Sequence, residues 1–291
     1  MRSYRLVSRG LATVLRQARY EVVPTPSIAD EVVAHVPPDV PVAVTASPSK
    51  GLEPTLGLTE RLVGHGYRVV PHVSARLVVD EVHLAEIVAR LRALGVDDVF
   101  VPAGDADPPY GRYDAALPLL ADLTALGRPF ARVGITGYPQ SHPAISDAET
   151  VRAMTAKSGH ADYIVSNLCF DPKALRAWVE DVRRRGVTLP IRLGVAGPVE
   201  RTRLLSTATK IGVEDAARFL GSHLSWFLRL TAPGGYSPDR LLGRLSSTLT
   251  SPTADVVGLH VFTFNQVAQT ERWRRRLLAR LSERPDAGSV A

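Results

Sequence analysis

Short runs rich in β-branched residues alternate with longer segments of helical periodicity, and this alternation is the feature that most limits the possible folds. Eight runs have the length and residue types of strands: 20–24, 41–47, 68–73, 98–104, 131–137, 162–168, 191–197 and 258–264. Several segments between them end on Gly after a Leu- or Arg-rich turn, which is a common stop for a helix. Examples of the helix candidates are 54–66, 79–95, 114–127, 147–159 and 171–186. This pattern predicts parallel strands joined by helical crossovers.

The number of strands and the chain length together favour a closed barrel. Eight strand–helix units within 291 residues predict a single (β/α)8 TIM barrel that occupies residues 1–291. We expect a short amphipathic helix before the first strand, and a long helical insertion, within the crossover 198–257, before the last strand. An open, doubly wound sheet is the alternative, but no Gly-x-Gly-x-x-Gly motif follows the first strand. Asp147 and Asp171 stand where helix N-caps belong.

Composition excludes several classes of protein. The single cysteine, Cys169, cannot form an internal disulfide, and no Cys/His spacing suggests zinc. No apolar run has the length of a membrane helix, and the basic N-terminus lacks the continuous apolar core of a signal peptide, so we expect a cytoplasmic protein without a membrane partner.

The net charge of +6 comes from scattered Arg residues, and the densest run, 271–285, resembles a solvated terminal helix more than a nucleic-acid patch. An anionic small substrate suits this charge, whereas the oligomeric state stays open.

The ends of the predicted strands carry an unusual number of polar and aromatic residues. In a barrel of this type the active site forms at the C-terminal ends of the strands. The residues expected there are Glu21, Thr45, His72, Asp105, Tyr138, Gln140, His142, Asn167, Arg192, Thr263, Phe264 and Asn265. This set contains no evident metal cluster and no Ser-His-Asp pattern.

Glu21 is the residue that most needs an explanation, because it lies in an apolar strand and a buried charge is costly unless it is paired. It either pairs with an interior cation such as Arg192, or acts as an acid whose pKa is raised by burial. Asp105 fits a turn as well as a catalytic role, and a lone histidine such as His72 is most often structural. Asn167 favours function, because Asn is depleted in strands, whereas Phe264 is more often a core residue than a stacking platform.

Six short segments resemble, in order, motifs of the methylenetetrahydrofolate reductase family. They cover most of the chain, from residue 20 to residue 266, and are YEVVPTPS, VPHVSAR, VPAGD, GYPQSHPAI, VSNLCFD and LHVFTFN. The resemblance implies a (β/α)8 barrel that reduces 5,10-methylenetetrahydrofolate to 5-methyltetrahydrofolate with electrons from NADH or NADPH. Both folate and a nicotinamide dinucleotide are then partners of the protein.

The resemblance also implies roles for particular residues. Glu21 would be the general acid that protonates N10, and Asp105 the acid near the pterin and the cofactor. Asn167 stands where the family more often has Gln at the pterin edge, and Thr263, Phe264 and Arg192 complete the expected substrate side. The residues matching the family's flavin site are Thr45, His72, Ala103, Gly104, Tyr138 and His142.

The chain departs from the family where flavin phosphates are held. Ala103 replaces an Arg before the Gly-Asp of the fourth strand, and the helix after the fifth strand offers only Arg152 and Lys157. Charge-assisted hydrogen bonds contribute about 1.5–3 kcal/mol each, so their loss argues against bound FAD. We therefore expect direct hydride transfer from NADH without flavin. The alternatives are an FAD-dependent reductase, a glycoside hydrolase that uses Glu21 and Asp105, and an inactive folate- or nucleotide-binding protein.

Overall fold

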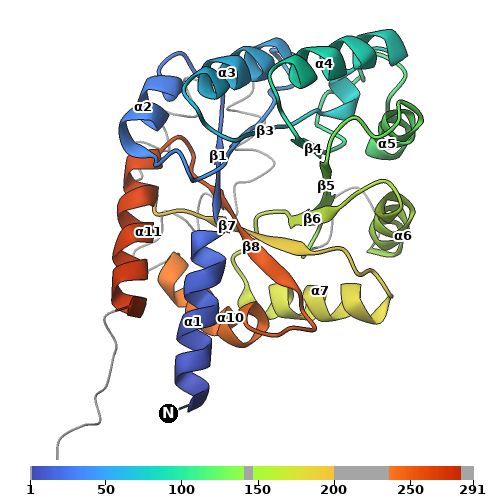
Figure 1. Cartoon of the computed structure of the whole chain (residues 1–291). Helices are drawn as coiled ribbons and strands as arrows, with labels where there is room; N and C mark the ends of the chain where they lie inside the picture. Colours follow the sequence, from blue (N-terminus) through green and yellow to red (C-terminus); the bar gives the residue numbers. More distant parts are fainter. Residues whose placement is uncertain (1, 141–146, 200–235, 283–291) are drawn as a thin grey trace, which may run out of the picture.

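Eight parallel strands form one sheet that curls into a barrel, with helices around its outside (Figure 1). The computed structural model describes residues 2–140, 147–199 and 236–282. Neighbouring strands follow the order β3-β2-β1-β8-β7-β6-β5-β4. The ring is closed between β3 and β4 by a parallel bridge from His72 to Phe100 and by a hydrogen bond of 2.9 Å from the Val73 N–H to the Phe100 carbonyl. The predicted TIM barrel is confirmed.

All eight predicted strands are present, although most are shorter than their apolar runs. Their bounds are β1 Arg19–Val22, β2 Val42–Val44, β3 Val69–Pro71, β4 Asp98–Val101, β5 Arg132–Gly137, β6 Tyr163–Ser166, β7 Ile191–Ala196 and β8 Val256–Phe262. Strand pairing stops where the chain turns outward, and the residues that follow form the loops at the C-terminal end of the barrel.

The predicted helices are also present. Their bounds are α1 Arg2–Arg16, α2 Ile28–His35, α3 Glu53–Gly64, η1 Ala75–Leu77, α4 Glu81–Ala93, α5 Ala116–Ala125, α6 Asp147–Ser158, α7 Pro172–Arg184, α10 Pro238–Leu249 and α11 Val267–Ser282. Asp171 caps α7 as expected, since its carboxylate accepts from the Lys173 N–H at 2.8 Å. Of the long insertion, residues 200–235 lie outside the described residues, and α10 is its last part. None of the described helices is long and apolar enough to cross a membrane.

Period-two alternation along the strands separates two cores. One set of apolar residues, such as Tyr20, Val42 and Val99, packs between the sheet and the surrounding helices. A second, smaller cluster consists of Ala43, Val70, Phe100, Tyr163 and Val165. Because successive side chains of a strand point to opposite faces, this second cluster fills the inside of the barrel.

Large interior side chains require glycines on neighbouring strands. A Cβ on Gly134 would lie 2.4 Å from the ring of Tyr163, and a Cβ on Gly258 would lie 2.5 Å from a guanidinium nitrogen of Arg192. These two glycines in β5 and β8 therefore make room for the polar groups that fill the amino end of the barrel.

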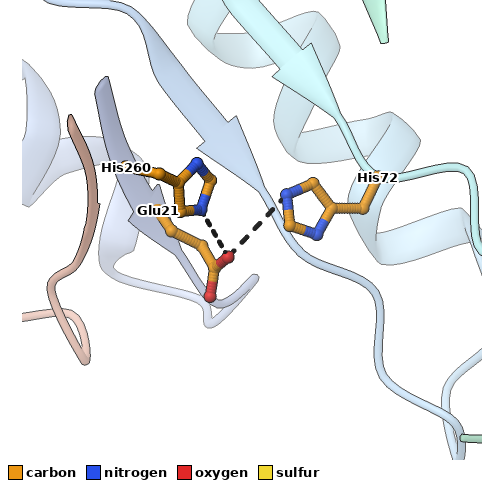
Figure 2. Close-up of side chains that lie close together, drawn as sticks. All are labelled: Glu21, His72 and His260. Atoms are coloured by element: carbon orange, nitrogen blue, oxygen red, sulfur yellow. Dashed lines mark hydrogen bonds and ion pairs between the residues drawn. The ribbon is translucent and has the colours of Figure 1, made fainter. Parts of the chain in front are cut away.

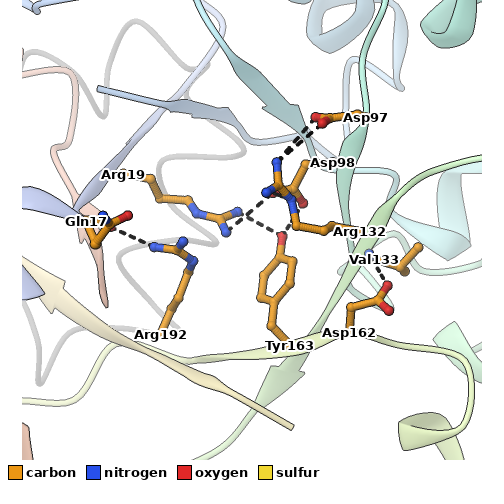
Figure 3. Close-up of polar contacts among 9 residues, drawn as sticks. All are labelled: Gln17, Arg19, Asp97, Asp98, Arg132, Val133, Asp162, Tyr163 and Arg192. Atoms are coloured by element: carbon orange, nitrogen blue, oxygen red, sulfur yellow. Dashed lines mark hydrogen bonds and ion pairs between the residues drawn. The ribbon is translucent and has the colours of Figure 1, made fainter. Parts of the chain in front are cut away.

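The amino end of the barrel is closed by a buried ion cluster (Figure 3). Arg19, only 2% exposed, donates to the Tyr163 hydroxyl at 2.8 Å and lies 3.8 Å from the Asp98 carboxylate. The same hydroxyl donates to Asp98 at 2.7 Å, and Arg132 approaches Asp98 at 3.2 Å. Asp98 is thus the shared anion of a cluster rich in arginine.

Candidate functional site

The C-terminal ends of the strands bring most of the predicted site residues to one mouth of the barrel. Glu21 lies one residue before the end of β1, and the others follow directly on the ends of their strands. Those placed in this way are Thr45 after β2, His72 after β3, Ala103, Gly104 and Asp105 in the loop after β4, Tyr138 after β5, Asn167 after β6, and Thr263 and Phe264 after β8. His142 lies outside the described residues.

Glu21 is at the centre of a compact polar group in this mouth (Figure 2). Its Oε2 lies 2.8 Å from Nε2 of His260 and 3.8 Å from Nε2 of His72. The Glu21 side chain is 16% exposed, whereas those of His72 and His260 are 5% and 1% exposed. The acid therefore touches solvent on one side and two buried imidazoles on the other.

Burial shifts the pKa values of all three groups away from their ordinary values. Desolvation raises the pKa of Glu21, and His72 opposes that rise only in part. Desolvation also lowers the pKa of His72 to about 3, and lowers the pKa of His260 well below its usual value. Burial thus favours the neutral form of both imidazoles and the acid form of Glu21, and the carboxyl group and Nε2 of His260 are close enough to share a proton. The arrangement suits a proton held at the rim of the barrel.

His260 is the site residue that sequence reasoning did not single out. It lies inside β8, where it pairs in register with Arg19 rather than with Glu21. The alternation of side chains along β8 could have identified it. Leu259 and Val261 belong to the outer core, so His260 and Phe262 point into the barrel. A histidine at an inward position of a strand adjoining that of Glu21 is a candidate partner for the acid.

A metal ion is a second way to use these three side chains. One ligand atom from each of Glu21, His72 and His260 lies within 4.8 Å of the others. The sequence-based set did not contain this group, because His260 lies inside β8 and not at its end. Two ligands of a tetrahedral zinc ion, with bonds of about 2.0–2.1 Å, stand roughly 3.3 Å apart. Glu21 and His260 are closer than this, at 2.8 Å, which is a hydrogen-bonding distance. The geometry fits a shared proton better than a bridging cation.

Two predicted substrate-binding residues need correction. Arg192 is the second residue of β7, so it lies toward the amino end of the barrel, where its guanidinium donates to the Gln17 carbonyl at 2.7 Å. Burial and the neighbouring Arg19 lower the pKa of Arg192 to about 10. It does not pair with Glu21. Thr263 is fully buried, and its hydroxyl donates to the Glu21 carbonyl at 2.6 Å, so it supports the acid instead of facing a substrate.

The loop after β4 is held by its own contacts. Gly104 has a φ of 88°, a backbone conformation that favours glycine, and it packs closely against Ser74. The Ala103 carbonyl accepts from the Arg76 N–H at 2.9 Å. Asp105 is exposed. Burial raises the pKa of Tyr138, and the negative charge of Asp105 adds to that rise. Asp105 and Tyr138 are therefore close enough for the charge of Asp105 to act on the Tyr138 hydroxyl.

Cationic side chains near these loops are largely committed or poorly placed for a phosphate. The Arg76 guanidinium donates to the Ala106 carbonyl at 2.6 Å and to Asp107 at 3.1 Å. On α6, Arg152 is exposed, and burial lowers the pKa of Lys157 to about 8. Among the described residues, no hydrogen bond or ion pair links either of these two side chains of α6 to the strand-end loops.

The chain is similar to proteins of known families. The family model for methylenetetrahydrofolate reductase matches residues 42–214, more than half of the chain. Methylenetetrahydrofolate reductase (NADH) 1 from Zea mays is 26% identical over 125 residues, a match that covers 36% of this chain and 21% of the maize protein. The match thus spans about a fifth of the length of this curated relative.

Solved structures with the same architecture are more distant in sequence. A protein assigned as a lyase/mutase from Burkholderia cenocepacia has a TM-score of 0.50 and 13% identity, covering 98% of this chain and 95% of that one. Dihydropteroate synthase from Thermus thermophilus, in complex with 6HMPPP, has a TM-score of 0.40 and 14% identity, covering 90% and 93%. The first likeness concerns the fold alone, and the second is too distant to add to it.

Proposed function

Because the chain belongs to the methylenetetrahydrofolate reductase family, we propose that it reduces 5,10-methylenetetrahydrofolate to 5-methyltetrahydrofolate, with NADH as the hydride donor and Glu21 as the general acid. The observation that carries the proposal is the position of Glu21 at the mouth of the barrel, where burial raises its pKa and its carboxyl group lies 2.8 Å from Nε2 of the buried His260. The name of the maize relative supports NADH as the donor.

The reaction requires a proton before the hydride can arrive. The substrate holds a methylene group between N5 and N10. Protonation of N10 by Glu21 allows the bond from the methylene carbon to N10 to break, which leaves an iminium at N5. Hydride from the nicotinamide then reduces that carbon to a methyl group, so one NADH and one proton are consumed per turnover. Burial raises the pKa of Glu21, which favours the protonated form that this step requires.

The cationic side chains that could bind a pyrophosphate favour NADH as a substrate over FAD as a resident cofactor. FAD would have to remain bound between turnovers, and within the described residues near the loop after β4, Ala103 and the committed Arg76 supply few charge-assisted partners for its pyrophosphate. NADH is a substrate that binds and leaves, and an enzyme works with a KM of about 1 μM–1 mM. The same sparse set of donors is therefore adequate for NADH, and we infer no step through flavin.

We expect the purified protein to carry no flavin and to follow ternary-complex kinetics. If one mouth holds folate and NADH together, double-reciprocal plots of rate against NADH at several folate concentrations intersect. Absorbance of the denatured supernatant measures released flavin. Yellow flavin in stoichiometric amount, or parallel plots, would instead identify the FAD-dependent version of the same reductase.

The pH dependence of turnover follows from the same acid. Glu21 acts in its protonated form, so kcat is expected to be level at low pH and to fall as pH rises through the raised pKa of Glu21. The matching measurement is kcat at saturating substrates across the range in which the protein stays folded. A fall in kcat toward acidic pH would mean that the required group is an ionised base.

The hydrolase alternative needs Glu21 and Asp105 to act as a pair. The hydrogen-bond partner of Glu21 is His260, and Asp105 is exposed in the loop after β4, so the contacts favour the reductase. An inactive binding protein would bind folate and NADH without oxidising NADH, and a methylenetetrahydrofolate-dependent NADH oxidation assay separates it from the proposed enzyme.

A further inference from the structure

The end of β8 supplies an unusual share of the contacts that hold Glu21. In the sheet, Glu21 pairs in register with Phe262. Its carboxyl group meets His260 from the same strand. Its carbonyl accepts twice from the next residue, from the Thr263 hydroxyl at 2.6 Å and from the Thr263 N–H at 3.3 Å. Both the backbone and the side chain of the acid are thus fixed against one strand.

Asn265 continues this attachment beyond the last paired residue. Its Oδ1 accepts from the Val23 N–H at 2.8 Å, and its Nδ2 donates to the Val23 carbonyl at 2.9 Å and to the Thr25 hydroxyl at 3.1 Å. A single carboxamide therefore satisfies both backbone groups of Val23, as a peptide group of a neighbouring strand would do. The side chain extends the pairing of β1 with β8 past the point where β8 ends.

The backbone of this segment is held in a conformation that most residues avoid. Phe264 has a φ of 49° and Asn265 a φ of 58°, so two consecutive non-glycine residues are left-handed. The Thr263 hydroxyl also accepts from the Asn265 N–H at 3.1 Å, which links the two polar residues across the turn. Such strain persists only where surrounding contacts enforce it, and it is concentrated at functional sites.

We propose that Thr263 and Asn265 form a clamp that positions the Glu21 carboxyl group for proton transfer to the folate. The clamp acts through Glu21 and the loop that follows it, so both are positioning residues, and this inference rests on the proposed function. Thr263 is fully buried, which leaves its hydroxyl to serve the backbone of Glu21 rather than a ligand. The clamp accounts for the polar side chains of Thr263 and Asn265 at the left-handed turn that follows β8.

The test compares Thr263→Val, which keeps the shape but removes the hydroxyl, with Thr263→Ser, which keeps the hydroxyl. Thr59→Val is the matched control, because Thr59 is equally buried and its hydroxyl donates to the Thr55 carbonyl within α3. Asn265→Gly removes the carboxamide but accepts the left-handed backbone, so it separates the clamp from the strain. Each variant is assayed for kcat and KM against pH, and for thermal unfolding.

Thr263→Val and Asn265→Gly are expected to lower kcat by about 10²-fold, as misplacement of a catalytic group by roughly 1 Å can do. KM for NADH and folate should change little, and Thr263→Ser should recover most of the loss. The pH at which kcat falls should move to lower values, because an acid released into water returns toward its ordinary pKa. Thr59→Val should change none of these.

A purely structural role would give a different result. If Thr263→Val and Asn265→Gly lower the melting temperature but keep the kcat and pH profile of Thr59→Val, the clamp is not a positioning device. The same conclusion holds if KM rises while kcat stays constant. Failure of the proposed function gives a different pattern, because Glu21→Gln itself would then retain the parental rate. If Glu21→Gln is inactive while Thr263→Val and Asn265→Gly remain fully active, only the clamp is overturned. Should Thr263→Val not fold, Asn265→Gly and Thr263→Ser decide between the outcomes.

Discussion

Glu21→Gln is expected to lower the rate of methylenetetrahydrofolate-dependent NADH oxidation by about 10²–10⁴-fold, the usual contribution of a general acid. Glutamine has the shape of the protonated acid, and its carboxamide can both donate to and accept from Nε2 of His260, so the site should keep its geometry. What it lacks is a proton that it can transfer to N10. Loss of rate without loss of folate binding would therefore report on proton transfer itself.

A matched control for this variant is Glu31→Gln. Glu31 lies on α2 with its side chain 52% exposed, and it forms only a surface pair with His35. The control should retain the parental rate and melting temperature. Folate and NADH affinities, measured by calorimetry on all three proteins, should agree within a few-fold. A Glu21→Gln enzyme that turns over at the parental rate would remove the acid from the proposal.

Asp98→Asn is expected to be the most destabilising of these substitutions. Asp98 is 8% exposed, accepts from the Tyr163 hydroxyl and lies against the buried guanidinium of Arg19 (Figure 3). Although desolvation raises the pKa of Asp98, the positive charges of Arg19 and Arg132 favour its ionised form. Removing that charge leaves Arg19 buried without a carboxylate, and breaking a buried pair costs about 3–5 kcal/mol.

Asp97→Asn is the control for this prediction, because Asp97 is the neighbouring residue and also pairs with Arg132. Its side chain is 65% exposed, and the distance to Arg132 is 3.4 Å. Exposed ion pairs contribute roughly 0–1 kcal/mol, so this variant should unfold close to the parental protein. Denaturant unfolding of the two variants measures the difference. Equal free energies of unfolding would mean that the amino end of the barrel does not depend on the charge of Asp98.

Most of the fold could be predicted from the sequence because its signals are local. The alternation of β-branched runs with helical segments marks each strand, and parallel strands in this number close in few ways. Helix α2, Ile28–His35, was not named among the predicted helices; it has only eight residues and contains two adjacent valines, which have a low helix propensity. The long segment before β8 was predicted as an insertion, and only its last helix, α10, is described.

The site was harder to predict because it depends on the phase and register of neighbouring strands. Arg192 was expected at the mouth, but it pairs with Gly258 near the start of β7, whereas Ala196 of the same strand pairs with Phe262 near the mouth. His260 was overlooked because its contact with Glu21 joins β8 to β1 and appears only when the barrel closes. Thr263 was expected to bind substrate, since the sequence does not reveal that its hydroxyl turns back to the Glu21 carbonyl.

The protonation state of Glu21 at neutral pH is the claim on which the whole account depends. An infrared difference spectrum between the parental protein and Glu21→Gln at pH 7 measures it directly. We predict the carbonyl band of a protonated carboxylic acid that is present in the parental protein, absent from the variant, and lost as pH rises in parallel with kcat. A spectrum that shows only carboxylate bands for Glu21 at neutral pH would contradict the account.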